Sequence, residues 1–186
     1  MNYSAIKYCD IANGVGVRTS VFVSGCRLRC PGCFNFSAWD FEAGEAWTPE
    51  VEARVLDSLE PPYVEGLSVL GGEPMEPENQ AGLVGLLEAV RARYGHGRSI
   101  WMYSGHTLDE LLPGGAWHVE GLTDRILATL DVLVDGPFVA AEHDITLRFR
   151  GSANQRLIDM PATLATGGAT VVPWVDDPLF ATHALD

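Results

Sequence analysis

The chain has 186 residues, of which 47% are hydrophobic and 20% are charged, and its formal net charge is −13. This length favours a single domain with a substantial hydrophobic core. A strongly negative surface repels phosphate backbones and anionic lipid, so we expect neither a nucleic acid nor a membrane as a partner.

The location of the protein is predicted from its N-terminus, its hydropathy and its cysteines. Residues 1–10 lack the basic-then-apolar pattern of an export signal, and no stretch approaches the roughly 20 apolar residues of a membrane span. Three of the four cysteines lie between Cys26 and Cys33, a clustering that is typical of metal binding in a reducing compartment. We therefore expect a cytoplasmic protein.

The first half of the chain is predicted to contain two strand–loop–helix units. Residues 19–24 are β-branched or aromatic, which favours a strand that leads into a cysteine-rich loop over 25–36. Thr48 is typical of the N-cap of a helix, because Pro49 and an acidic residue follow it. The apolar run 67–70 predicts a buried strand that ends in a pair of glycines.

The second half continues the alternation of helices and strands. In chain order we expect a helix from Pro77 to Gly95, a strand over 99–103, a short helix with a capping box at Thr107, a helix over 123–130, and strands over 132–134 and 145–150. Such alternation indicates βαβ units and a parallel sheet, in which sites form at the carboxyl ends of the strands. Four strand ends should therefore converge: the cysteine loop, Gly71 to Pro74, Ser104-Gly105 and Asp135-Gly136.

The cysteine loop has the spacing Cys26-x3-Cys30-x2-Cys33. Three thiolates on a short loop can ligate three corners of an iron–sulfur cubane, and full ligation would require a fourth. The remaining cysteine, Cys9, precedes the first predicted strand, so we expect a buried or half-buried thiol with no ligand role. One iron would then stay open to a substrate, by the logic that separates catalytic from structural metal sites.

A structural zinc site is the alternative interpretation of this loop. Zinc takes four ligands, commonly as paired short spacings of cysteine or histidine. The sequence offers no second pair, because its histidines are scattered singly. This argues for a cluster with an open iron.

The sequence around these cysteines resembles a known family. The motif CRLRCPGCF over 26–34 has the spacing and the trailing aromatic residue of the radical S-adenosylmethionine superfamily. The segments FVSGC, PGCFN, GGEP, LVDGPF and RGSANQR make the chain similar to the glycyl-radical activases that act on anaerobic ribonucleoside-triphosphate reductase. The chain departs from that pattern at Val15, where proline is common, and at Phe34, where tyrosine is common.

The resemblance implies a fold and a reaction. The fold would be a single-domain α/β structure over residues 1–156, an incomplete (β/α) barrel of parallel strands. A 4Fe-4S cluster on the three clustered cysteines would cleave S-adenosyl-L-methionine reductively, and the resulting radical would take a hydrogen atom from a glycine of the reductase's large subunit. A flavodoxin-like protein would supply the electron. Residues 157–186 match nothing in the family, and we expect either an extra strand over 170–175 or a loose extension.

The resemblance also implies the cofactor contacts. Gly71, Gly72 and Glu73 would hold the methionine ammonium, since carbonyls and a carboxylate suit a cation. The same residues also suit a strand-to-helix turn, and both roles can hold together, but the resemblance favours binding.

Gly32, Cys33 and Phe34 would contact the adenine in the family, although an isolated phenylalanine is more often part of a core. Ser104-Gly105 and Asp135-Gly136 fit either cofactor contacts or simple turns. Arg18, Arg150 and Arg156 flank the family motifs, and we assign them no role.

Two other functions remain open at this stage. One is a sibling in the superfamily, either an activase of another glycyl-radical enzyme or a small-molecule radical enzyme such as a deazapurine synthase. The other is a non-catalytic iron–sulfur or zinc module for electron transfer or assembly. The open coordination and the GGEP segment argue against the second.

Overall fold

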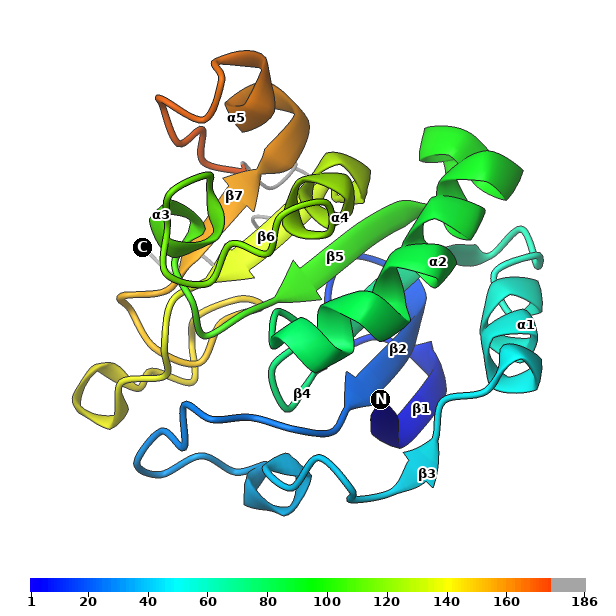
Figure 1. Cartoon of the computed structure of the whole chain (residues 1–186), viewed down its shortest axis with the longest axis horizontal. Coiled ribbons are helices and arrows are strands. Elements are labelled where there is room, and N and C mark those ends of the chain that lie inside the picture. Colours follow the sequence, from blue (N-terminus) through cyan, green and yellow to red (C-terminus); the bar gives the residue numbers. More distant parts are fainter. Residues whose placement is uncertain (175–186) are drawn as a thin grey trace.

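A computed structural model describes residues 1–174 and contains one mixed sheet of seven strands in the order β3-β1-β2-β4-β5-β6-β7 (Figure 1). The strands are β1 (Asn2–Asp10), β2 (Val17–Val23), β3 (Glu45–Ala46), β4 (Val64–Gly71), β5 (Ser99–Tyr103), β6 (Val132–Asp135) and β7 (Arg156–Asp159). Strands β2, β4, β5 and β6 are mutually parallel, whereas β1, β3 and β7 pair antiparallel with their neighbours.

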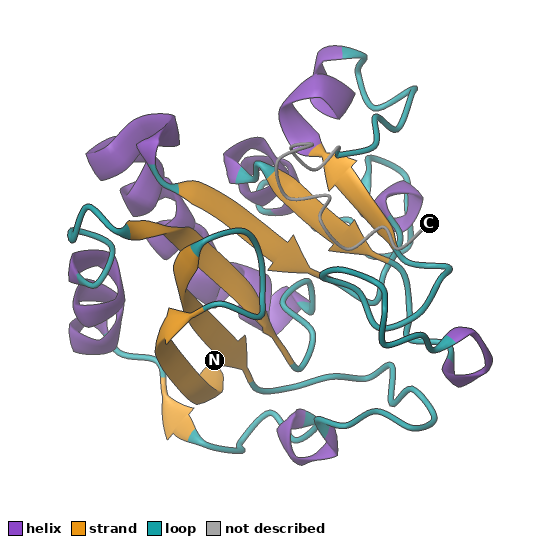
Figure 2. Ribbon diagram, turned by 180° about the vertical axis from the view of Figure 1, so that it is seen from behind, coloured by secondary structure: helices purple, strands orange, loops and turns teal. Residues whose placement is uncertain are grey.

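The α-helices are α1 (Pro49–Asp57), α2 (Pro77–Tyr94), α3 (Leu108–Leu111), α4 (Thr123–Thr129) and α5 (Met160–Ala165). Three short 3-10 helices complete the described elements: Phe36–Ala38, Gly95–Gly97 and Ala140–Glu142. The side chain of Thr48 accepts a hydrogen bond from the Val51 amide, as expected of the N-cap of α1. Seen from behind in Figure 2, the strands lie in front of the longer helices, which therefore cover one face of the sheet.

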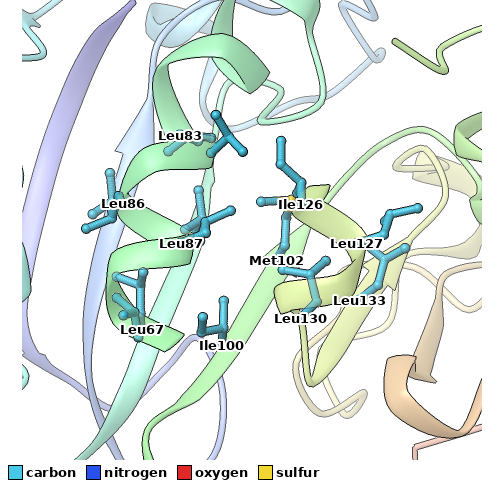
Figure 3. Packing of buried hydrophobic residues seen from close by; sticks show 14 of the residues in the cluster. Leu67, Leu83, Leu86, Leu87, Ile100, Met102, Ile126, Leu127, Leu130 and Leu133 are labelled. Atoms are coloured by element: carbon cyan, nitrogen blue, oxygen red, sulfur yellow. The ribbon is translucent and has the colours of Figure 1, made fainter. Parts of the chain in front are cut away.

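The main core lies between this sheet face and the helices. Alternate residues of a strand point to opposite faces, and Ile100 and Met102 of β5 belong to the cluster that the helices cover. Figure 3 shows Leu83 and Leu87 of α2 directed toward Ile126 of α4 and toward Met102. This layer of completely buried aliphatic side chains fixes α2, and therefore its N-terminus, against the parallel strands.

The opposite face of the sheet carries no described α-helix packed against the strand centres and is lined by a smaller cluster. Trp101, Val132 and Val134 form it, and Phe149 packs edge-on against Trp101 with ring centroids 5.1 Å apart. At the amino ends of the strands, the same face buries Arg18 completely. Its guanidinium donates to Ser68 Oγ (2.7 Å) and to the backbone oxygens of Leu67 (2.7 Å), Ser99 (3.0 Å) and Val15 (3.1 Å).

The α/β class and the four parallel strands expected from the sequence are confirmed, but two predictions need correction. The strands are not all parallel, because β1, β3 and β7 are antiparallel. The sheet is not closed. That it forms part of an incomplete barrel stays a prediction. Residues 145–150 form turns and not a strand.

The predicted extension after residue 156 begins inside the sheet. Strand β7 starts at Arg156 and pairs with β6, and α5 follows it directly. Residues 170–174 form no strand, although Pro173 makes an isolated bridge with Ile158; the last residue of the strand predicted there, Val175, lies outside the described residues. Within 1–174, none of the helices combines the length and the apolar character needed to cross a membrane.

Replacing Leu87 by alanine tests the core. Leu87→Ala should lower the free energy of unfolding by about 2–5 kcal/mol, because buried methyl groups are lost and a cavity remains. Ile11→Ala is the control: Ile11 is 74% exposed, and its truncation should change the free energy of unfolding by less than about 0.5 kcal/mol. Chemical denaturation measures both, and equal effects would contradict this description of the core.

Candidate functional site

A cavity of about 750 Å³ lies at the carboxyl ends of the parallel strands. Figures 1 and 2 show the loop after β2 and the loop between β6 and β7 on this same side of the sheet, beyond the arrowheads of the parallel strands. Every residue that the sequence assigned to the cluster or the cofactor lines the cavity: Cys26, Cys30, Gly32, Cys33, Phe34, Gly71, Gly72 and Glu73. Ser104, Gly105 and Gly136 line it as well, so all four predicted strand ends converge.

The three clustered cysteines are free thiols in different surroundings. Cys26 is buried, whereas Cys30 and Cys33 are half-buried. Burial raises the pKa of the Cys26 thiol, against the opposing effect of hydrogen bonds from the backbone amides of Arg29 and Leu28. Arg29 has a φ of 47°, and this left-handed conformation turns the loop sharply between the first and second cysteines.

The fourth cysteine lies far from this loop. Cys9 stands near the end of β1, beside residues 18–20 at the start of β2, whereas the cysteine loop follows the other end of β2. Cys9 is exposed, so the prediction of a buried or half-buried thiol is wrong. The reason is that β3 pairs only with the first residues of β1, which leaves the end of β1 at an open edge of the sheet.

Glu73 ties the loop after β4 to the loop after β5. Its carboxylate is completely buried and accepts hydrogen bonds from the amides of Met75 (2.8 Å) and Gly105 (2.7 Å) and from the hydroxyl of Ser104 (2.8 Å). Burial raises the pKa of Glu73 to about 7, although these three donors each lower it. A carboxylate has about four accepting positions, so Glu73 keeps one for a further donor.

The loop after β4 is also joined to the cysteine loop. The amides of Gly72 and Glu73 donate to the backbone oxygens of Val23 (2.7 Å) and Gly25 (2.8 Å). Asn79, in the first turn of α2, is buried and donates from its amide nitrogen to the oxygens of Ser24 (3.0 Å) and Glu73 (2.9 Å). The start of α2 therefore holds both loops at once.

Gly72 is required at this junction for a steric reason. A Cβ on Gly72 would lie 2.5 Å from the backbone oxygen of Gly25, closer than such atoms approach, so a side chain would displace the cysteine loop.

A further part of the cavity lining comes from the loop between β6 and β7. Phe138, Arg150, Gly151 and Gln155 line it. Gln155 accepts from the Gly151 amide at 2.8 Å and donates to the oxygen of Gly136 at 3.0 Å, which fixes the segment RGSANQR against the end of β6. Arg150 donates to the backbone oxygen of Gln155 at 2.8 Å.

Asp135, which the sequence left between a cofactor contact and a turn, does not line the cavity. Its buried carboxylate accepts from the Leu108 amide and from the guanidinium of Arg156. Arg156 is therefore explained by its ion pair with Asp135.

Arg18 also has a structural role, since it links neighbouring strands at their amino ends by hydrogen bonds.

Phe34 is 89% exposed, which excludes the alternative that it is a core residue of this chain. Asn79 was missed from the sequence: an amide just after the helix-opening Pro77 was the signal for a group that binds the neighbouring loops.

Comparison with known proteins gives the family. The domain family described as a 4Fe-4S single cluster domain matches residues 12–158. Over 157 residues, the chain is 37% identical to the anaerobic ribonucleoside-triphosphate reductase-activating protein of Vibrio cholerae and 36% identical to that of Escherichia coli K12; each alignment covers 83% of this chain and 96% of the relative. The protein of that name from Enterobacteria phage T4 is 33% identical over 159 residues, 84% of this chain and 93% of the relative.

The chain belongs to this family of activating proteins. The resemblance drawn from the sequence motifs is thereby confirmed. The matched residues contain all three clustered cysteines and the GGEP segment, and they reach into β7.

The residues present fit an iron–sulfur cluster. Thiolates are the usual ligands of such clusters, and each cysteine of a cubane binds a different iron, so the sulfurs need not meet at one point. Within residues 1–174, no three side chains of His, Cys, Asp or Glu are arranged to hold a single metal ion. The free thiols of Cys26, Cys30 and Cys33 line one cavity together, which suits a multinuclear group.

The raised pKa of Glu73 predicts how the apoprotein responds to pH. An unfolded glutamic acid titrates near pH 4.5, so between about pH 4.5 and pH 7 the folded state holds a proton that the unfolded state has lost. The free energy of unfolding should therefore fall as the pH rises through this window, by about 3 kcal/mol from this group.

Glu73→Gln removes the titrating group and keeps the size of the side chain. The difference in free energy of unfolding between wild type and Glu73→Gln, measured by urea denaturation at several pH values, isolates Glu73 from other titrating groups. A difference that stays constant across the window would mean that Glu73 titrates at its ordinary pKa.

Proposed function

We propose that this protein activates an anaerobic ribonucleoside-triphosphate reductase by reductive cleavage of S-adenosyl-L-methionine at a 4Fe-4S cluster. One observation carries the proposal: three free thiols with Cys-x3-Cys-x2-Cys spacing line the same cavity as four strand ends. Membership of the activating-protein family supports the choice of partner.

Cys26, Cys30 and Cys33 would hold the cluster and leave one iron for the substrate. Gly71, Gly72 and Glu73 line the same cavity as these thiols and would receive the methionine end of S-adenosyl-L-methionine. The free accepting position of the Glu73 carboxylate suits an ammonium group. Gly32, Cys33 and Phe34 would face the adenine.

A cluster held by Cys26, Cys30 and Cys33 would supply the one electron that is needed to break the sulfur–C5′ bond of S-adenosyl-L-methionine, with methionine and a 5′-deoxyadenosyl radical as products. That radical would take a hydrogen atom from a glycine of the reductase's large subunit, so that 5′-deoxyadenosine would leave and the unpaired electron would stay on the glycine. A flavodoxin-like donor would return the electron. The chain itself supplies no acid or base in this scheme.

The chain's own contribution is position and the exclusion of other hydrogen donors. Phe22, Leu70 and Phe138 give the cavity apolar walls, which disfavour water near the reacting atoms. The volume of about 750 Å³ is within the range of small-molecule sites, which hold roughly 300–1,000 Å³.

Anaerobic reconstitution tests the chemistry. The protein loaded with iron and sulfide, then reduced with dithionite, should convert S-adenosyl-L-methionine to 5′-deoxyadenosine, measured by chromatography. Cys30→Ser should lose the cluster absorbance and the product, whereas Cys9→Ser should keep both, because Cys9 lies at the other end of β2. A protein that binds zinc alone, or equal losses in the two variants, would refute the proposal.

Mixing with candidate partners tests the biological role. The reduced holoprotein and S-adenosyl-L-methionine should produce a glycyl radical, seen by electron paramagnetic resonance, on the large subunit of the anaerobic reductase encoded in the same genome. A glycyl-radical enzyme of another class is the control and should stay silent. A signal on the control alone would assign the protein to another activase class.

A further inference from the structure

Arg27, inside the spacer between the first two cysteines, joins the cysteine loop to the N-terminus of α2. Its backbone amide donates to Glu76 Oε1 at 2.7 Å, and its guanidinium nitrogen Nη1 donates to Glu76 Oε2 at 2.5 Å. The guanidinium also pairs with Glu78 through bonds of 2.6 and 3.0 Å. Its carbon Cζ lies 4.4 Å from the ring centroid of Phe41.

The two carboxylates in this arrangement differ in burial. The side chain of Glu76 is completely buried, whereas those of Glu78 and Arg27 are each about half exposed. Both oxygens of Glu76 accept from Arg27. A half-exposed ion pair contributes little to stability, but removing the partner of a buried charge is strongly destabilising. The bonds to Glu76 therefore dominate the energetics of this contact.

The bonds to Glu76 fix the orientation of the backbone at Arg27, and the next two amides of the loop follow from it. The Arg27 amide is held by Glu76, and the next two amides, those of Leu28 and Arg29, hydrogen-bond to the sulfur of Cys26. Arg29 has a left-handed φ of 47°, which turns the chain sharply at the second of these amides. Successive amides that bind one atom form anion-binding concavities, which recur at iron–sulfur sites.

We propose that Arg27 is a positioning residue that, by clamping its own amide and side chain to Glu76, holds Cys26 ready for the cluster and keeps two amides on its sulfur. This inference rests on the cluster of the proposed function. Amide hydrogen bonds to a ligating sulfur stabilise the more negative, reduced state of a cluster, so the clamp raises the cluster's reduction potential.

The chain offers a matched control for this ion pair. Arg125 binds Glu88 through two bonds of 2.8 and 2.7 Å, and both side chains are about half exposed, as in the Arg27–Glu78 pair. Arg125 lies on α4 and is not among the residues that line the cavity. Arg125→Gln therefore removes an equivalent surface pair without touching the buried Glu76.

The test compares reconstituted wild type, Arg27→Gln, Glu78→Gln and Arg125→Gln. Iron loss to an excess of chelator and the midpoint potential of the cluster are followed anaerobically by absorbance. Arg27→Gln should lose iron about tenfold faster or more, with a midpoint potential that is shifted to more negative values. Glu78→Gln and Arg125→Gln should stay within about twofold of wild type and keep its potential.

Two further arms keep the result interpretable. Arg27→Lys retains a positive charge near Glu76 but lacks the planar guanidinium. Its midpoint potential should therefore lie between those of Arg27→Gln and wild type. If Arg27→Gln does not fold, Arg27→Lys is compared with wild type in its place. The melting temperature of the apoprotein should fall more for Arg27→Gln than for Arg125→Gln, even if the wild type binds no cluster and the proposed function fails. Wild-type iron loss and potential in both Arg27 variants would overturn the inference.

Discussion

The site depends on one constraint: parallel strands end side by side, and the polar groups in the loops that follow must be satisfied among themselves. In this protein, side chains at the start of α2 make most of the hydrogen bonds that join these loops. Asn79 binds the oxygens of Ser24 and Glu73, and Glu76 binds the backbone of Arg27. Since α2 is anchored by its leucines in the core, the position of the cysteine loop is set by packing far from the cysteines.

Buried carboxylates are the means by which this acidic chain joins its loops. Glu73, Glu76 and Asp135 are each buried, and each accepts at least one backbone amide from a different loop or element. A buried carboxylate without donors would be costly, so each of these groups specifies one arrangement of the loops around it. Two of them also receive a guanidinium from an arginine, Arg27 or Arg156. Glu73 receives none, which leaves its remaining accepting position available to a cationic ligand.

Much of this arrangement could be predicted from the sequence, because its signals are local. The strand over 99–103, the capping box at Thr107 and the glycine-rich strand ends appear where they were expected. Strand β1 was missed, since its register is interrupted twice and its pattern is not a clean alternation. Strand β7 was missed because its four residues include Arg156 and Asp159, so it lacks the apolar run that marks β6.

Residues 145–150 show how a local pattern can mislead. They alternate apolar and polar side chains as a strand does, yet the Asp144 carboxylate binds the amide of Thr146 at 2.8 Å and favours a turn instead. Gln155 then holds the amide of Gly151, which follows the turns. The partners of Asn79 and Glu76 were equally out of reach, because they lie about 50 positions away in the sequence. The place of Asn79 after Pro77 indicates a side chain that binds backbone groups, but it does not indicate which loop supplies them.

The two ends of the parallel strands are built for opposite purposes, and this division bears on the proposed chemistry. At the amino ends, the buried side chain of Arg18 packs on the sheet face that the helices do not cover. Its guanidinium donates to neutral oxygens, so a positive charge is buried there with its hydrogen bonds made. At the carboxyl ends, glycines such as Gly72 and Gly105 leave space between the loops, and the cavity opens there. A reactive radical formed at the cysteine loop would therefore meet apolar walls on the sheet side and could reach a partner through the open side. In the proposed chemistry, the intermediate would lie beside loops that are joined by the carboxylate of Glu73, which accepts from three donors, whereas the large buried cation, Arg18, lies at the far end of the strands.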